Sequence, residues 1–199
     1  MALKIGMEKI PCICVTNRAL CKGDFLLRIQ KIAESDVADA ILLREKDLSE
    51  EDYYALAAEV LSLCAEYKKR CILHQFYPVA MELGCREIHL PLHVLQEMRG
   101  KKETRDFFTT VGTSVHSMKQ AKLATHFQVN YMTAGHIFET DCKKGLPGRG
   151  LSFLEKITEQ VENPVFGIGG ITLENANEVT RAGAAGVCIM SGFMLETVT

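Results

Sequence analysis

The sequence has no tryptophan, only five prolines, and no apolar run near the roughly 20 residues of a membrane-spanning helix. Its first residues also lack the charged start, apolar stretch and small-residue cleavage site of a secretory leader. Hydrophobic residues make up 47% of the 199 residues, which is an ordinary globular composition. These features predict a cytoplasmic protein with no membrane partner.

An excess of charge of either sign is lacking too. Lysine and arginine number 23 against 25 aspartates and glutamates, for a net charge of −2, and the basic residues are scattered along the chain. Binding to nucleic acid or to an anionic membrane requires clustered basic residues. The expected partner is therefore a small molecule, with no nucleic acid.

The eight cysteines include no C-x-x-C pair and no paired zinc-knuckle spacing. Most are expected to be small buried hydrophobic residues, including Cys12 and Cys14, which share one face of a strand. Cys142 differs because it lies beside Lys143 and Lys144 in a polar segment, where a nearby positive charge lowers a thiol pKa. A bystander role is the alternative for Cys142.

Short apolar and β-branched runs alternate with longer segments of helical period. Strands are expected at 12–16, 39–43, 71–74, 87–90, 108–112, 129–133, 164–168 and 185–190. Helices are expected at 24–34, 49–67, 77–83, 94–98, 117–125, 151–161 and 173–182. Parallel strands joined by crossover helices close into a (β/α)8 barrel, which typically needs about 250 residues. We therefore predict a compact TIM barrel of the α/β class, one domain over 1–199, with a shortened C-terminal helix.

An open doubly wound sheet is the alternative fold, but the G-x-G-x-x-G fingerprint after the first strand is missing. The helix that starts at Ser49 has the clearest signals. Ser49 can cap its first turn with Asp52 as the third residue in, and Leu56, Val60 and Leu63 are expected to form its buried stripe.

The carboxyl ends of barrel strands carry the chemistry in this fold, and here those ends are polar. Gly169 and Gly170 follow the seventh strand, and Ser191 and Gly192 follow the eighth. Backbone N–H groups at these positions commonly bind phosphate in such barrels. Glycines that only form a turn are the alternative. His136 ends the sixth strand and is a candidate base, because imidazole can take and return a proton near neutral pH.

Several motifs carry a resemblance to a known family. They are L-R-E-K-D at 43–47, G-T-S-V-H-S at 112–117, Y-M-T-A-G-H-I-F-E-T-D-C-K-K-G-L-P-G-R-G at 131–150, P-V-F-G-I-G-G-I at 164–171 and G-V-C-I-M-S-G at 186–192. The chain resembles the thiamin phosphate synthase superfamily, and most closely its TenI branch, the thiazole tautomerases. The resemblance implies an isomerase of thiamin biosynthesis that aromatises a carboxylated thiazole phosphate by a proton transfer.

The resemblance also implies roles for single residues. His136 is the catalytic base, and Arg44, Lys46 and Lys143 bind the substrate carboxylate. Gly169, Gly170, Ser191 and Gly192 bind the phosphate, while Ser114, His116 and Thr140 line the rim of the pocket. The implied partner is a small phosphorylated thiazole, and no cofactor is expected. The short C-terminus also suggests a homo-oligomer.

Two other functions stay open. A thiamine phosphate synthase joins a pyrimidine pyrophosphate to a thiazole phosphate, releases pyrophosphate and uses Mg²⁺ held by aspartates after strands 3 and 4. This chain has His74-Gln75 and His89-Leu90-Pro91-Leu92-His93 there, so His74, His89 and His93 could instead form a transition-metal site. The second alternative is a regulatory or ligand-binding protein without turnover.

Overall fold

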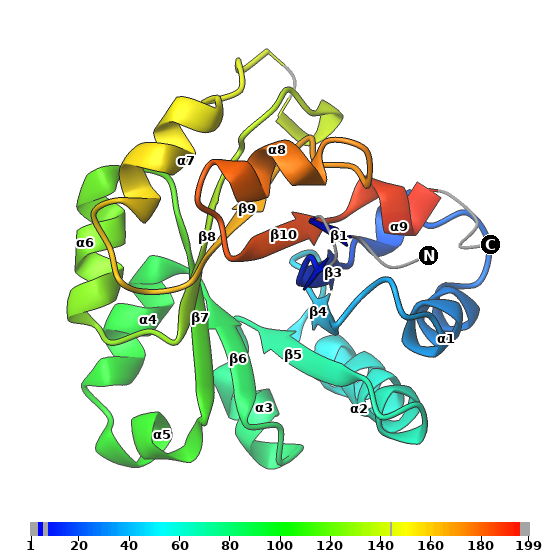
Figure 1. Ribbon diagram of the computed structural model, residues 1–199. Helices are drawn as coiled ribbons and strands as arrows, with labels where there is room; N and C mark the ends of the chain where they lie inside the picture. The colour runs from blue at the N-terminus through cyan, green and yellow to red at the C-terminus, as the bar shows by residue number, and fades with distance from the viewer. Residues whose placement is uncertain (1–3, 6–7, 144, 196–199) are drawn as a thin grey trace.

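The computed structural model describes residues 4–5, 8–143 and 145–195 (Figure 1). Its barrel strands are β3 (Cys12–Val15), β4 (Ala40–Leu43), β5 (Arg70–His74), β6 (Glu87–Leu90), β7 (Thr110–Val115), β8 (Tyr131–Gly135), β9 (Val165–Ile168) and β10 (Gly186–Ile189). All neighbouring pairs are parallel, and β10 pairs with β3 to close the ring. The prediction of a (β/α)8 barrel is therefore confirmed.

Helices lie outside this ring of strands, as Figure 1 shows. Their bounds are α1 (Phe25–Glu34), α2 (Glu50–Glu66), α3 (Tyr77–Glu82), α4 (Leu92–Arg99), α5 (Lys102–Phe107), α6 (Met118–His126), α7 (Leu151–Thr158), α8 (Ala176–Arg181) and α9 (Ser191–Leu195). Two 3-10 turns, η1 (Arg18–Leu20) and η2 (Asp141–Lys143), follow β3 and β8. The five residues of α9 agree with the expected short final helix.

The strand pair β1 and β2, helix α5 and the two 3-10 turns were not predicted from the sequence. The antiparallel pair β1 (Lys4–Ile5) and β2 (Glu8–Lys9) is too short to produce a pattern. Helix α5 is almost entirely polar and buries only Thr104, so it lacks an apolar stripe. The strand predicted at 108–112 is β7, which ends at Val115. The polar residues Thr113 and Ser114 interrupt the apolar pattern, so the end of the strand was predicted too early.

The core has two layers, one on each face of the barrel wall. The interior contains Ile13, Val15, Ala40, Leu42, Ile72, Tyr131 and Cys188. A larger cluster between the strands and the helices includes Cys12, Cys14, Cys64, Cys71 and Cys85. These cysteines are free thiols and are buried, so they act as small hydrophobic residues. The side chain of Cys142 lies outside the described part of the structure.

Helix α2 connects the outer layer to the strand ends. Ser49 caps it by accepting a hydrogen bond from the Asp52 N–H, as the sequence predicts. The predicted buried stripe was partly wrong, since Tyr53, Ala57, Val60 and Cys64 are buried, whereas Leu56 and Leu63 are only partly buried. The Tyr53 hydroxyl donates to the Leu43 carbonyl at 2.7 Å and accepts from the His74 N–H at 2.8 Å. This side chain therefore fixes the carboxyl ends of β4 and β5 relative to each other.

Within the described residues, none of the helices combines the length and the apolar character needed to cross a membrane.

Candidate functional site

A cavity of about 540 Å³ opens at the carboxyl ends of the barrel strands. Ten of the predicted site residues line it: Arg44, Lys46, Ser114, His116, His136, Thr140, Lys143, Gly169, Gly170 and Ser191. Gly192 is not among its lining residues, so its predicted contact with a ligand is not supported. The apolar wall consists of Val15, Leu42, Pro91, Leu92, Ile168, Ile171 and Met190. The lining of the cavity therefore combines charged and polar groups with apolar side chains.

The inner part of the cavity contains a hydrogen-bonded histidine, His89. Its Nδ1 lies 3.0 Å from the Tyr131 hydroxyl and its Nε2 lies 2.9 Å from the Ser114 Oγ. The Thr133 hydroxyl donates to the same Ser114 Oγ at 3.0 Å. Burial and the positive charges of Arg44 and Lys46 lower the pKa of His89 to about 3. The ring is therefore neutral at physiological pH, and both of its nitrogens are already engaged.

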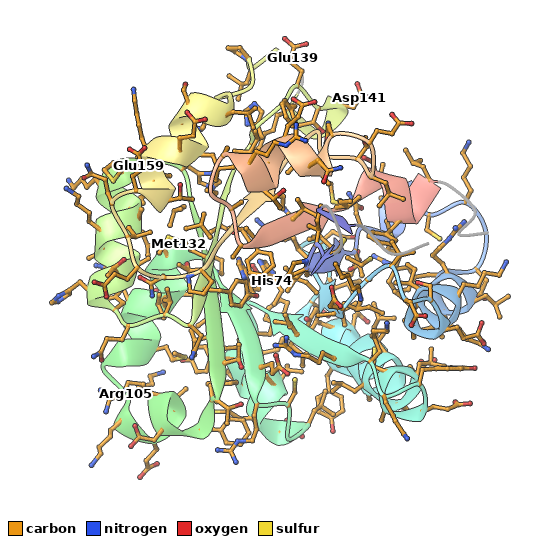
Figure 2. All side chains as sticks on the ribbon, viewed as in Figure 1. His74, Arg105, Met132, Glu139, Asp141 and Glu159 are labelled. Carbon is orange, nitrogen blue, oxygen red and sulfur yellow. The ribbon has the colours of Figure 1, made fainter. Side chains whose placement is uncertain are left out.

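A second buried histidine, His74, also lines the cavity, and Figure 2 labels it near the middle of the barrel. The two rings stack with centroids 6.1 Å apart and an interplanar angle of 18°. Burial, followed by His89, Arg44 and Lys46, lowers the pKa of His74 to about 2. Its Nδ1 is buried without a hydrogen-bond partner. Burying a neutral ring with one unpaired acceptor nitrogen costs less free energy than burying a protonated ring with an unpaired charge. The low pKa of His74 agrees with this difference.

Positive charges converge on the rim from two separate elements. Arg44 and Lys46 follow β4, and Lys143 ends η2 in the loop after β8. Burial lowers the pKa of Lys46, and the positive charges of Arg44 and Lys143 lower it further. Lys46 makes no ion pair with any carboxylate in the described part of the chain. The rim therefore favours a ligand with negative charge.

The carboxylate of Glu45, which lies between Arg44 and Lys46 in the sequence, does not face the cavity. Glu45 is 2% exposed and is absent from the cavity lining. It accepts hydrogen bonds from the Thr16 hydroxyl at 2.6 Å and from the Arg18 N–H at 2.9 Å. The Thr16 hydroxyl oxygen also accepts from the Arg44 N–H at 2.9 Å. This network holds the turn after β4, so that Arg44 and Lys46 face the cavity and Glu45 does not.

The glycines after β9 pack against the loop after β8. A Cβ on Gly169 would lie 2.3 Å from the Cβ of His136, and φ at Gly169 is +97°. The Ile137 and Phe138 N–H groups donate to the carbonyls of Ile168 and Gly169. The N–H groups of Gly169 and Gly170 donate to no carbonyl in the described backbone. These glycines therefore have a structural role, and their N–H groups also remain free to bind an anion.

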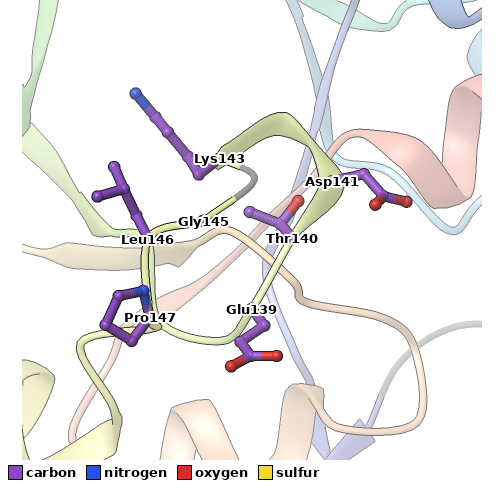
Figure 3. Close-up of a pocket in the computed structure, with 7 residues that line it drawn as sticks. All are labelled: Glu139, Thr140, Asp141, Lys143, Gly145, Leu146 and Pro147. Atoms are coloured by element: carbon purple, nitrogen blue, oxygen red, sulfur yellow. The ribbon is translucent and has the colours of Figure 1, made fainter.

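The loop after β8 forms its own hollow, lined by Glu139, Thr140, Asp141, Lys143, Gly145, Leu146 and Pro147 (Figure 3). Thr140 and Lys143 also line the main cavity, so the two spaces adjoin. Figure 3 shows Lys143 projecting away from Glu139 and Asp141. The His136 Nε2 lies 3.3 Å from the Leu146 carbonyl oxygen, which connects the start of the loop to its far side.

His116 is held by two contacts. Its Nδ1 lies 2.9 Å from the Gly135 carbonyl oxygen, so this nitrogen carries the proton. Its backbone N–H donates to the Gln120 Oε1 at 2.6 Å. Gln96, Gln120 and Thr133 also line the cavity and were missed from the sequence. The two glutamines lie on helices α4 and α6, where sequence position alone does not show which face meets the cavity.

Magnesium does not fit this set of side chains. It prefers oxygen ligands that include carboxylates, and no aspartate or glutamate is among the described residues that line the cavity. The described residues also contain no group of three or more histidine, cysteine, aspartate or glutamate side chains placed to hold a metal ion. The metal site considered for His74, His89 and His93 is therefore not formed.

The chain is similar in sequence to proteins that are named for the synthesis of thiamine phosphate. Residues 12–193 match the family model described as thiamine monophosphate synthase. A thiamine-phosphate synthase of Methanospirillum hungatei is 31% identical over 183 residues, covering 89% of this chain and 86% of that protein. One of Clostridium acetobutylicum is 30% identical over 185 residues, covering 90% and 85%. The solved structure of a thiamine phosphate pyrophosphorylase from Pyrococcus furiosus has a TM-score of 0.79 at 26% identity, covering 94% and 89%.

These relatives correct the functional prediction. The prediction of a thiazole tautomerase, an isomerase, is wrong, because the similar proteins are named as synthases. The prediction rested on the loop around His136 and on the lack of aspartates after the third and fourth predicted strands, and both features can change while a barrel is retained. His136 accordingly loses its predicted role as the base of a proton transfer.

Proposed function

Because the chain belongs to the thiamine monophosphate synthase family, we propose that it joins a pyrimidine pyrophosphate to a thiazole phosphate and releases pyrophosphate. In this reaction the bond between the pyrimidine methylene carbon and the pyrophosphate oxygen breaks, and that oxygen keeps the electron pair. The lone pair of the thiazole nitrogen forms the new carbon–nitrogen bond. The product is thiamine phosphate.

The observation that carries the proposal is the presence of two regions suited to anions in one cavity. Arg44, Lys46 and Lys143 supply positive charge on one part of the rim. Gly169, Gly170 and Ser191 offer N–H groups and a hydroxyl after β9 and β10. The apolar side chains that line the same cavity suit aromatic rings. A reaction between two phosphorylated heterocycles needs this combination.

In this proposal the cations of the rim accelerate the reaction, and the buried histidines transfer no proton. Negative charge grows on the pyrophosphate as its bond to carbon breaks, so fixed positive charges stabilise the transition state more than the ground state. The thiazole nitrogen attacks with a lone pair and loses no proton. Neutral His74 and His89 agree with this chemistry, because rings with pKa values of about 2 and 3 do not donate protons at neutral pH.

A second candidate function is binding of a phosphorylated heterocycle without turnover. The observation in its favour is the lack of a carboxylate among the described residues that line the cavity. A protein that only binds its ligand requires the anion-binding groups and does not require stabilisation of a leaving group.

The test is to incubate the full chain with both substrates, with and without MgCl₂, and to quantify thiamine phosphate by chromatography. We expect product from the native chain and about tenfold or more loss in Lys46→Met, since charged contacts of this kind contribute about 1.5–3 kcal/mol. Lys156→Met, an exposed lysine on α7, is the matched control and should keep full activity. No product under either condition would overturn the synthase proposal.

A further inference from the structure

We propose that the cavity binds pyrophosphate without a divalent metal ion, with Arg44, Lys46 and Lys143 supplying the neutralising charge. The choice of pyrophosphate as the ligand rests on the proposed function. The absence of a metal requirement rests on the side chains of the cavity itself. Proteins commonly bind Mg²⁺ at pyrophosphate groups through one or two carboxylates together with the phosphate oxygens.

Three carboxylates close to the rim in sequence do not line the cavity. Glu45 is committed to Thr16 and to the Arg18 N–H, on the other side of the turn after β4. Glu139 and Asp141 line the adjoining hollow and are absent from the main cavity. Figure 2 shows both at the outer edge of the molecule, while His74 lies inside the barrel. Glu45, Glu139 and Asp141 are therefore absent from the lining of the cavity in which a cation would have to bind.

The buried histidines His74 and His89 do not replace carboxylates as metal ligands. Both nitrogens of His89 lie within hydrogen-bond distance of hydroxyl groups, from Tyr131 and Ser114. The ring of His74 is stacked on that of His89 with an interplanar angle of 18°. Coordination of one ion by both rings would require breaking the contacts of His89 and turning one ring. Neutral imidazole is in any case a poor ligand for Mg²⁺, which prefers oxygen.

The positive charges at the rim repel one another. Lys46 lies close enough to Arg44 and Lys143 for their charges to disfavour its own protonation. Arg44 and Lys46 lie in the turn after β4 and Lys143 lies in the loop after β8, so the cations line a common cavity from two segments. An anion with several negative charges relieves this repulsion, as Mg²⁺ would not. A pyrophosphate placed between the two elements therefore has its charge compensated by the protein alone.

The experiment is calorimetric titration of the full chain with inorganic pyrophosphate, in excess EDTA and again in excess MgCl₂. We expect binding in EDTA that is at least as tight as in MgCl₂, because Mg²⁺ competes for the free pyrophosphate. Lys46→Met and Lys143→Met should each weaken binding in EDTA about tenfold. Lys156→Met should bind as the native chain does, and circular dichroism checks that each variant is folded.

Binding that is absent in EDTA and restored by MgCl₂ would overturn this inference. So would equal affinity of the native chain and both rim variants. Different results would contradict the two proposals. Metal-free pyrophosphate binding without formation of thiamine phosphate would contradict only the proposed function. Turnover with pyrophosphate binding that requires Mg²⁺ would contradict only the metal-free site.

Discussion

At the scale of single residues, the buried pair His74 and His89 makes stability depend on pH. Their pKa values fall from an ordinary 6.5 to about 2 and about 3 on folding, chiefly through burial. The unfolded chain therefore binds more protons than the folded chain between these values and 6.5. Their stabilising contribution is complete above pH 6.5 and is lost progressively as the pH falls below it.

We expect the free energy of unfolding to fall by about 1.4 kcal/mol for each histidine per pH unit below its ordinary pKa. Urea unfolding at a series of pH values between neutrality and mild acid measures this slope. His89→Gln should give a flatter dependence, because one of the two titrating groups is removed. His126→Gln, on the exposed face of α6, controls for the loss of an imidazole. Parallel curves for the native chain and His89→Gln would contradict the prediction.

At the scale of elements, the rim depends on contact between the loop after β8 and the turn after β9. Gly169 permits this contact, since a Cβ there would lie 2.3 Å from the Cβ of His136. Gly145 has a similar positive φ, +81°, but nothing lies within 4 Å of a Cβ built on it. The two positions therefore separate backbone strain from a collision between loops.

We expect Gly145→Ala to cost about 1–2 kcal/mol of unfolding free energy through backbone strain alone. Gly169→Ala should cost about 1–3 kcal/mol more, because the His136 segment must also move. Thermal and urea unfolding of both variants measure the difference. Equal destabilisation would show that the contact between the two loops contributes nothing.

At the scale of the whole molecule, the charge distribution is uneven. The chain has a net charge of −2, yet no acidic residue is among the described residues that line the cavity, where Arg44, Lys46 and Lys143 lie. Attraction of an anionic ligand must therefore come from the local field and not from the total charge. Such a field at a partly exposed rim is screened by salt.

Raising NaCl from about 0.05 M to about 0.5 M is expected to weaken pyrophosphate binding by about tenfold, since the screening length falls severalfold over this range. Titration at each salt concentration gives the slope. Lys46→Met should show a shallower slope, because one of the screened charges is removed. An affinity of the native chain that does not change with salt would argue against an electrostatic site.

The sequence by itself determined the barrel and most of the candidate cavity. Alternating strand and helix patterns are local, and the carboxyl ends of parallel strands must meet at one end of a barrel. Arg44, Ser114, His136 and Gly169 could therefore be assigned to one rim although they lie far apart in the chain. The cap at Ser49 and the buried cysteines are likewise short-range or compositional features.

The tertiary structure decided the properties that depend on groups distant in sequence. The low pKa values of His74 and His89 arise from burial and from neighbours on other strands, which no local pattern contains. The turn of Glu45 away from the cavity depends on Thr16 and Arg18, about one βα unit earlier in the chain. Only the folded barrel could show that a rim rich in cations has no described carboxylate facing its cavity.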